Sequence, residues 1–320
     1  MAGPPKSKSS APEAAPLLQD APHPQPDPQP GAPLETLADE APPPRDGPRT
    51  LDLVPGYGEM IKPAELIDIS GATGLTLSAR RMYNLMIAHA FGPDMGREGQ
   101  EWTLDLADLR GTHKGNERIE DSILALMKTI VTVRLADGRT RRVALLGGND
   151  MDDPQRPRGT LTYSFDKRLV PLLRQSSVFG KLELEVMRAF STKYALALYE
   201  ALSRRVRLSS IFSETFTLDE FRELLGVPEG KLTSYSNLNL KAIKPAAAEI
   251  NAMASFGCEI IPVKQSRRVV AVKIAWWQKS MDELKEAYRE VQRPRIGRRA
   301  RITGQVEEAA PNPAPLAAQP

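Results

Sequence analysis

Two lysines on one predicted helix, Lys241 and Lys244, are the residues whose type and spacing best suit a chemical task. At about 100° per residue along a helix, they cluster on one face with Asn237 and Ala248. Lysine can contact phosphate or guanine, asparagine can contact adenine, and a small side chain permits close approach, so this face suits a DNA major groove. The alternative is an ordinary solvated helix face, because exposed lysine-rich faces are common. The surrounding elements must decide between these two interpretations.

The segment before these lysines has the signals of a helix followed by a turn. Thr217 and Glu220 have the spacing of a capping box, in which two side chains satisfy backbone N–H groups at a helix N-terminus. The apolar residues of this helix share one face, and they are Leu218, Phe221, Leu224 and Leu225. Gly226, Pro228 and Gly230 then end the helix and turn the chain. The sequence therefore predicts a helix-turn-helix whose second helix carries the two lysines.

The second helix is predicted over residues 237–254, and its core face lies away from the lysines. That core face is predicted to comprise Leu240, Ile243, Ala247, Ile250 and Ala254. Pro245 interrupts the helix, because proline lacks the N–H that would donate to the Lys241 carbonyl. Either the helix kinks there or regular helix begins near Ile243. Asn237 precedes the interruption, so its place on the basic face depends on which of these occurs.

The same order of elements occurs twice along the chain. In the first half the predicted elements are a helix over 77–90, a short strand and helix over 102–109, a helix over 116–129 and a hairpin about Asp137-Gly138, followed by a polar loop over 147–159. The apolar face of the helix over 116–129 is predicted to comprise Ile119, Ile123, Leu126 and Met127. In the second half the predicted elements are a helix over 191–208, a strand stub at 216–217, the helix-turn-helix and a hairpin over 258–277. Three helices followed by a β-hairpin form a winged helix. The predicted fold class is therefore α+β, with two tandem winged-helix domains and disordered termini.

The two ends of the chain differ in composition from its middle. Residues 1–50 contain half of the 28 prolines and almost no aromatic residues, and residues 305–320 are similar. Such segments bury too little apolar surface to fold. The net charge is +3, and the two ends carry −3 and −2, which leaves +8 for residues 51–304. A basic middle indicates a polyanionic partner, and nucleic acid is the first candidate.

Four segments follow from these patterns. They are a disordered proline-rich tail over 1–55, an N-terminal winged-helix domain over 56–180, a C-terminal winged-helix DNA-binding domain over 181–279, and a polar helix, arginine-rich arm and disordered tail over 280–320. Within the last segment, residues 293–301 contain five arginines. These arginines suit either phosphate binding from a flexible arm or simple solvation of the terminus.

The residue types give little support to catalytic or metal-dependent functions. A tyrosine nuclease would need Tyr194 or Tyr199 near a metal site, typically a pair of histidines, but the three histidines are far apart in the sequence. The sequence also lacks the Gly-x-x-x-x-Gly-Lys-Ser/Thr phosphate loop of ATPases. The single cysteine, Cys258, allows no internal disulfide and no cysteine-based zinc site, and is predicted to be a core residue. We therefore expect a protein that is not an enzyme and uses no cofactor or metal.

Other basic residues are expected to assist the two lysines. Those at the end of helix 191–208 and at the tip of the second hairpin should clamp phosphates rather than read bases, and they are Arg204, Arg205, Arg207, Lys264, Arg267 and Arg268. In the first domain the candidates stand at the start of the predicted recognition helix, where residues reach base edges, and they are Lys114, Asn116 and Arg118.

Several short motifs follow one another in a specific order. They are Lys193-Tyr194-Ala195, Leu198-Tyr199-Glu200, Leu224-Leu225-Gly226-Val227, and Pro245-Ala246 with Glu249-Ile250-Asn251. The segment LTYSFDKRLVPLL in the first half fits the same pattern. In order and spacing these motifs resemble the plasmid replication initiators that bind iterons, which are directly repeated origin sequences. The resemblance covers residues 70–277.

This resemblance implies a sequence-specific protein that binds double-stranded origin DNA. In that family the C-terminal winged helix places its recognition helix in the major groove of one half of a repeat. The N-terminal winged helix contacts the other half in the monomer, or forms the dimer interface. Monomers initiate replication, dimers commonly repress the initiator's own gene, and the usual partners are the host initiator protein and the replicative helicase. We expect a cytoplasmic protein associated with the nucleoid or plasmid, since no apolar run of membrane-spanning length and no signal peptide occurs.

Two other interpretations stay open from the sequence. The chain could be a winged-helix transcriptional regulator with no role in replication, or an enzyme acting at an origin. Directly repeated sites of about two helical turns beside the gene would favour an initiator, whereas a lone palindrome would favour a repressor.

Overall fold

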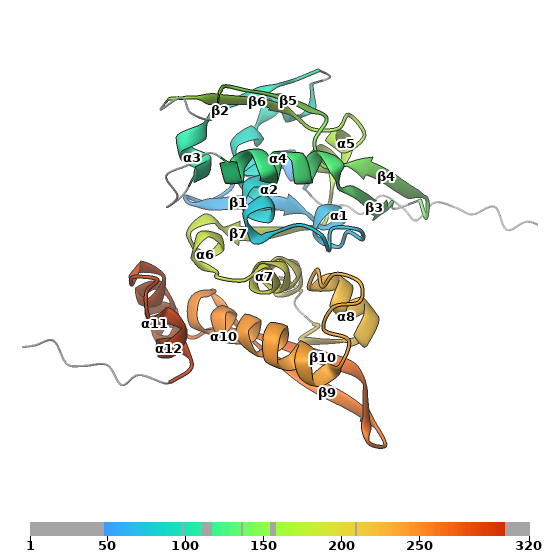
Figure 1. Cartoon of the computed structure of the whole chain (residues 1–320), viewed down its shortest axis with the longest axis vertical. Helices are drawn as coiled ribbons and strands as arrows, with labels where there is room; N and C mark the ends of the chain where they lie inside the picture. The colour runs from blue at the N-terminus through green and yellow to red at the C-terminus, as the bar shows by residue number, and fades with distance from the viewer. Residues whose placement is uncertain are drawn as a thin grey trace, which may run out of the picture. The chain divides into compact units, whose positions relative to one another are not determined.

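The computed structural model describes residues 48–304 except residues 98, 111–116, 136, 154–157 and 209. Within this part the chain forms two winged-helix domains, as the sequence predicts (Figure 1). The first comprises α2 (Leu77–Ala90), β2 (Trp102–Asp105), α3 (Leu106–Arg110), α4 (Glu117–Lys128), β3 (Ile130–Arg134) and β4 (Thr140–Ala144). The predicted apolar face of α4 is confirmed, since Ile119, Ile123 and Leu126 are all buried. The predicted hairpin is also confirmed, and Gly138 in its turn has a φ of +80° that favours glycine.

The segment after this hairpin carries a strand where the sequence predicts a polar loop. β5 (Gly148–Met151) pairs antiparallel with β6 (Thr160–Ser164), and β6 also pairs with β2. The resulting sheet has the order β2-β6-β5. The loop prediction was wrong over β5, because backbone pairing at a sheet edge does not require apolar side chains. Two further short elements, α5 (Val170–Gln175) and the 3-10 helix η2 (Pro93–Gly96), contact each other.

A two-stranded sheet joins the beginning of the described chain to its middle. β1 (Glu59–Pro63) pairs antiparallel with β7 (Phe179–Glu183), and each strand leads into a short helix, α1 (Ala64–Ile67) or α6 (Leu184–Ala189). Before β1, in the 3-10 helix η1 (Thr50–Asp52), Thr50 is buried and its amide N donates to the Ser176 carbonyl over 2.9 Å. Folded structure therefore begins before residue 55, the predicted end of the disordered tail. Residues 1–47 lie outside the described part, and the predicted domain limit at 180/181 falls inside β7.

The second winged helix follows the predicted order. Its elements are α7 (Lys193–Arg205), β8 (Ser213–Thr217), α8 (Leu218–Leu224), α9 (Tyr235–Leu238), the π-helix η3 (Asn239–Ile243), α10 (Lys244–Met253), β9 (Phe256–Gln265) and β10 (Arg268–Gln278). The predicted capping box of α8 is confirmed: Thr217 Oγ1 accepts from the Glu220 amide, and Glu220 Oε2 accepts from the Thr217 amide over 2.9 Å. β8, β10 and β9 form one antiparallel sheet, and Cys258 on β9 is buried as predicted.

The helix α7 is the first helix of the second winged helix, and it lies on the side that faces the first winged helix (Figure 1). Most of its residues are buried. It contacts β7, α1 and α2 on one side of the fold and α8 and α10 on the other. On α7, the ring of Tyr199 stacks on Phe256 of β9 with centroids 5.5 Å apart. A helix buried all round must be apolar or must pair its polar groups internally. Most buried residues of α7 are apolar, and its buried polar residue Glu200 is paired with neighbouring side chains.

Glu200 stands at the centre of a buried polar cluster. Lys62 Nζ of β1 donates to Glu200 Oε2 over 2.9 Å and to Asn84 Oδ1 of α2 over 2.9 Å. Asn84 Nδ2 donates to Glu200 Oε1 over 2.6 Å, and Arg80 Nη1 lies 3.9 Å from Glu200 Oε2. Burial lowers the pKa of Lys62, and the charge of Glu200 opposes that change. The cluster therefore ties β1, α2 and α7 together through one carboxylate.

The described residues after the second hairpin, up to residue 304, include two further helices. α11 (Met281–Gln292) is the predicted polar helix, and Ser280 and Glu283 form a capping box at its start. α12 (Arg298–Ile302) falls where the sequence suggests a flexible or solvated arm. Both of those interpretations were wrong for Arg298, whose side chain is buried because it bonds to carbonyl groups around it. Among the residues that the structure describes, no helix is long and apolar enough to cross a membrane.

We predict that Glu200→Gln lowers the free energy of unfolding by about 3–5 kcal/mol, because the change strands the buried charges of Lys62 and Arg80 without creating a cavity. Denaturant titration measures this. The matched control is Glu59→Gln, which removes a half-exposed partner of Lys181 at 3.8 Å and should cost less than about 1 kcal/mol. Equal losses in the two variants would contradict the prediction.

Candidate nucleic-acid interface

The start of the recognition helix is held in place by the preceding turn. Ser234 caps α9, and its Oγ accepts from the Asn237 amide over 3.3 Å. Arg222 of α8 donates to the Leu232 and Thr233 carbonyls, which fastens the turn to the first helix of the motif. The recognition helix therefore begins at Tyr235, two residues before the predicted start.

A π-turn sets the faces of the recognition helix. In η3 the Lys244 amide donates to the Asn239 carbonyl, five residues back, and regular α-helix resumes at Lys244. Pro245 then occupies the first turn of α10, a position where helices tolerate proline. Of the two predicted outcomes, regular helix beginning near Ile243 is the one observed.

The extra residue in the π-turn changes which side chains face the core. Leu240, predicted to lie in the core, is 64% exposed, and Leu238 is buried instead. Ile243, Ile250 and Ala254 are buried as predicted. The error for Leu240 arises because the prediction assumed 3.6 residues in every turn, whereas a π-turn contains more. An exposed leucine in a groove-binding face can contact thymine methyl groups.

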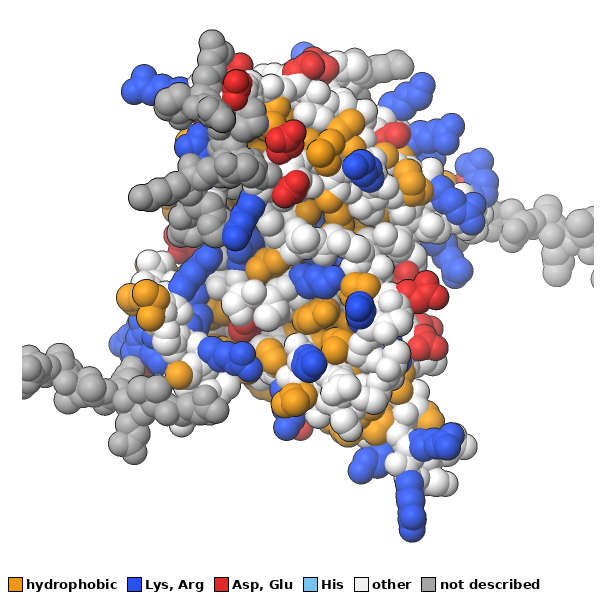
Figure 2. All heavy atoms as spheres, viewed as in Figure 1, with side chains coloured by type: hydrophobic (Ala, Val, Ile, Leu, Met, Phe, Trp, Pro, Cys, Tyr) orange, Lys and Arg blue, Asp and Glu red, His pale blue; other side chains and the backbone are white. Residues whose placement is uncertain are grey.

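Lys241 and Lys244 both lie on the exposed face of the recognition helix, together with Asn237. Neither lysine has an ion pair with any residue that the structure describes. Figure 2 shows Lys and Arg side chains across the face formed by α10 and α12 and at the tip of the β9–β10 hairpin. The recognition helix thus offers two uncompensated positive charges to a ligand.

The wing presents a second group of cations. Arg268 pairs with Gln265 across the hairpin, so Ser266 and Arg267 form a two-residue turn in which Ser266 has a φ of +56°. Lys264, Arg267 and Arg268 are all exposed, as their predicted role requires. Such a tip can reach phosphates beside the groove that the recognition helix enters.

The arginines at the end of α7 are engaged within the fold. Arg205 Nε lies 2.6 Å from Glu214 Oε2, its Nη1 donates to the Ala201 carbonyl over 3.0 Å, and its side chain is only 5% exposed. Arg204 Nη2 lies 2.8 Å from Asp68 Oδ2. Arg207 is exposed and its guanidinium lies 5.2 Å from the centroid of the Phe179 ring. Of the three predicted phosphate clamps, Arg205 is occupied by internal partners.

In the first domain, Arg118 is the one described residue among the three candidates. Lys114 and Asn116 lie outside the described residues. Arg118 stands in the first turn of α4 and lines a hollow with four other arginines, namely Arg81, Arg110, Arg188 and Arg295. Arg81 and Arg188 come from α2 and α6, so this basic hollow assembles residues that are far apart in the sequence.

The tyrosines considered as nucleophiles are poorly placed for that role. Tyr199 is buried, its hydroxyl accepts from the Glu183 amide over 2.9 Å, and burial raises its pKa. Tyr194 is half-buried, with Lys193 Nζ over its ring. Among the described residues, no group of three or more His, Cys, Asp or Glu side chains could hold a metal ion.

Two winged helices, with basic residues exposed on the recognition helix and wing of the second, define a tandem winged-helix DNA-binding protein. Residues 59–203 match the family model described as "Initiator Replication protein, WH1", and residues 217–276 match "Initiator Rep protein, WH2". Together these ranges cover more than half of the chain. The chain belongs to the initiator Rep protein family.

The chain was also compared with solved structures. A crystal structure of Pi initiator protein in complex with iteron DNA is similar, with a TM-score of 0.52 and 16% sequence identity, over 71% of this chain and 100% of that chain. A structure of domains 2 and 3 of RctB matches with a TM-score of 0.38 and 10% identity, over 70% of this chain and 94% of that chain. No curated protein matches the chain.

We predict that Arg205→Ala and the double variant Lys241→Ala/Lys244→Ala differ in their effect on stability. Loss of Arg205 removes a buried ion pair and a carbonyl contact, so the free energy of unfolding should fall by about 1–3 kcal/mol. The lysines contact solvent, so their removal should change it by less than about 0.5 kcal/mol. Thermal melting followed by circular dichroism distinguishes the two cases, and a comparable loss in the lysine variant would place those side chains in the fold rather than the interface.

Proposed function

We propose that this chain is a plasmid replication initiator that binds iterons, the direct repeats of a replication origin, in a sequence-specific way. The observation that carries the proposal is the pair Lys241 and Lys244, exposed and without ionic partners on the recognition helix of an initiator-family winged helix. Membership of the family supports the role in replication. The similar Pi initiator has been crystallised with iteron DNA, which suggests that the DNA contains repeats.

In the proposed complex the second winged helix reads one half of a repeat. Asn237 and Leu240 stand near the start of the recognition helix, where residues of such helices reach base edges. Lys241, Lys244 and the wing residues Lys264, Arg267 and Arg268 hold phosphates or guanines around them. The first winged helix binds the other half through the start of α4, with Lys114, Asn116 and Arg118 as the proposed contacts.

The proposed partners go beyond DNA. As a monomer the chain would initiate replication with the host initiator protein and the replicative helicase, and as a dimer it would repress its own gene. The activity is one of binding and remodelling DNA rather than of catalysis, because the tyrosines that could act as nucleophiles are buried or half-buried. We place the protein in the cytoplasm, on plasmid DNA.

A transcriptional regulator without a role in replication is the second candidate, since one winged helix with an exposed basic face suffices for operator binding. The two candidates differ in a genetic test. An origin fragment without its initiator gene should replicate when this protein is supplied in trans. Failure to replicate, with the repeats still bound, would leave the regulator as the explanation.

We predict that Lys241→Ala/Lys244→Ala lowers the affinity for the repeats by about 100-fold or more, because two contacts to charged groups are lost. Footprinting and fluorescence anisotropy on a duplex carrying one repeat measure the loss. Lys285→Ala is the matched control, since Lys285 is exposed on α11 and paired with Asp282 at 3.0 Å. An unchanged footprint in the double variant would refute the assignment of the groove-binding face.

A further inference from the structure

The groove beside Lys241 and Lys244 has a second wall, which is the C-terminal helix α12. The groove has a volume of about 830 Å³. Its lining includes Leu240, Lys241, Lys244 and Ala248 from the recognition helix and Arg299 and Ile302 from α12. α12 lies after residue 276, so it is outside both matched family models. The basic face of the recognition helix is therefore shared with an element that the family models do not describe.

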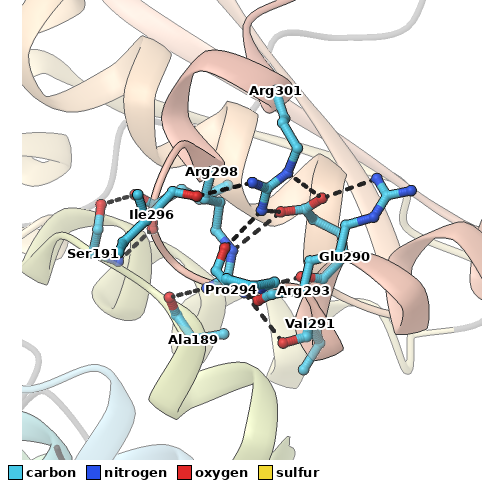
Figure 3. Close-up of polar contacts among 10 residues, drawn as sticks. Ala189, Ser191, Glu290, Val291, Arg293, Pro294, Ile296, Arg298 and Arg301 are labelled. Atoms are coloured by element: carbon cyan, nitrogen blue, oxygen red, sulfur yellow. Dashed lines mark hydrogen bonds and ion pairs between the residues drawn. The ribbon is translucent and has the colours of Figure 1, made fainter. Parts of the chain in front are cut away.

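α12 is held beside the recognition helix by a network centred on Arg298 (Figure 3). The guanidinium of Arg298 donates to the Ala189 carbonyl of α6 over 3.0 Å and to the Glu290 carbonyl of α11 over 2.9 Å. Its Nη2 also donates to the Val291 and Arg293 carbonyls. An arginine with this many partners in a buried position fixes the segment that carries it.

A second arginine of α12 closes the same network. Arg301 Nη2 donates to Glu290 Oε1 over 2.8 Å and to the Pro294 carbonyl over 2.8 Å. Burial opposes the ionisation of Glu290, but Arg301 and Arg298 outweigh it and hold its pKa below the usual range. Arg298 and Arg301 are thus occupied within the fold, and they orient the residue between them.

Arg299 differs from both neighbours, because its side chain is exposed and has no ionic partner among the described residues. It faces the groove that Lys241 and Lys244 also line. The acidic residue of that lining, Glu249, is buried, and its Oε2 accepts from the Ser191 amide over 2.8 Å. Three positive charges that share one groove repel each other, and a bound anion would offset this repulsion. The groove is therefore suited to an anionic ligand.

We propose that Arg299 completes, with Lys241 and Lys244, a binding site for the phosphodiester backbone of duplex DNA, and that α12, anchored on α11, acts as a built-in clamp. The inference rests on the proposed function, because it takes DNA as the ligand of the recognition helix. The mixed lining suits this ligand, because the three cations match phosphates and Ile302 offers apolar surface to the deoxyribose.

The test compares Arg299→Ala with Arg289→Ala in the full chain. Arg289 is an exposed arginine on α11, paired with Glu286 away from the groove, so it controls for the loss of one positive charge. Affinities are measured by anisotropy across a range of salt concentrations, on a repeat duplex and on a scrambled duplex of equal length. We expect Arg299→Ala to weaken binding to both duplexes about tenfold and to reduce the slope of log K against log salt by about 1. Arg299→Lys should recover most of the loss, and Arg289→Ala should match the unmodified protein.

The outcomes separate this inference from the proposed function. Equal affinity of the unmodified protein for both duplexes would count against repeat recognition, whereas the salt slope of Arg299→Ala would still report on the clamp. An unchanged slope, or a loss no larger than that of Arg289→Ala, overturns the clamp. Tighter binding by Arg299→Ala also overturns it, because α12 would then cover the recognition helix instead of assisting it.

A double-mutant cycle tests whether Arg299 and Lys244 hold the same phosphate. Arg299→Ala/Lys244→Ala should weaken binding by less than the product of the two single effects, because the second substitution acts on a contact already weakened. Strictly multiplicative effects would place Arg299 on a different phosphate and contradict the shared site.

Discussion

The buried carboxylate of Glu200 is the interaction on which the rest of the structure depends. It accepts from Lys62 of β1 and Asn84 of α2 while its own helix, α7, packs against α8 and α10. A buried charge is stable only when it is paired and hydrogen-bonded, so the strand, the two helices and the carboxylate must all take their places together. This requirement couples the first winged helix to the helix that supports the recognition helix, so the two surfaces proposed to contact DNA rest on one core.

A local irregularity in the recognition helix determines which of its side chains are exposed. Pro245 would break a regular helix, but the π-turn before it ends the first segment and lets α10 start at Lys244. The turn rotates Leu240 out of the core and keeps Lys241 and Lys244 on the exposed side. π-turns are frequent at functional sites, and here the turn lies within the face proposed to contact DNA.

Six of the described arginines illustrate two different roles of this side chain. One set bonds to carboxylates and carbonyl groups inside the fold and comprises Arg205, Arg298 and Arg301. The side chain of Arg298, on α12, bonds to both α6 and α11. Arg267, Arg268 and Arg299 project from a hairpin tip and from α12 without ionic partners among the described residues. The guanidinium groups of this second set are exposed to solvent, so they can reach a ligand. A basic composition by itself does not distinguish these groups, because the same guanidinium fork suits both tasks.

The sequence by itself determined the two winged helices, the capping box of α8 and the basic face of the recognition helix, because helical spacing and turn residues act locally. It also located Cys258 in the core and the hairpin turns. Tertiary structure decided what depends on distant partners, namely the strand β5, which pairs with β6, and the internal engagement of Arg205 and Arg298. These features follow from residues up to about a hundred positions apart meeting in space, as Arg298 and Ala189 do, and no local pattern contains that information.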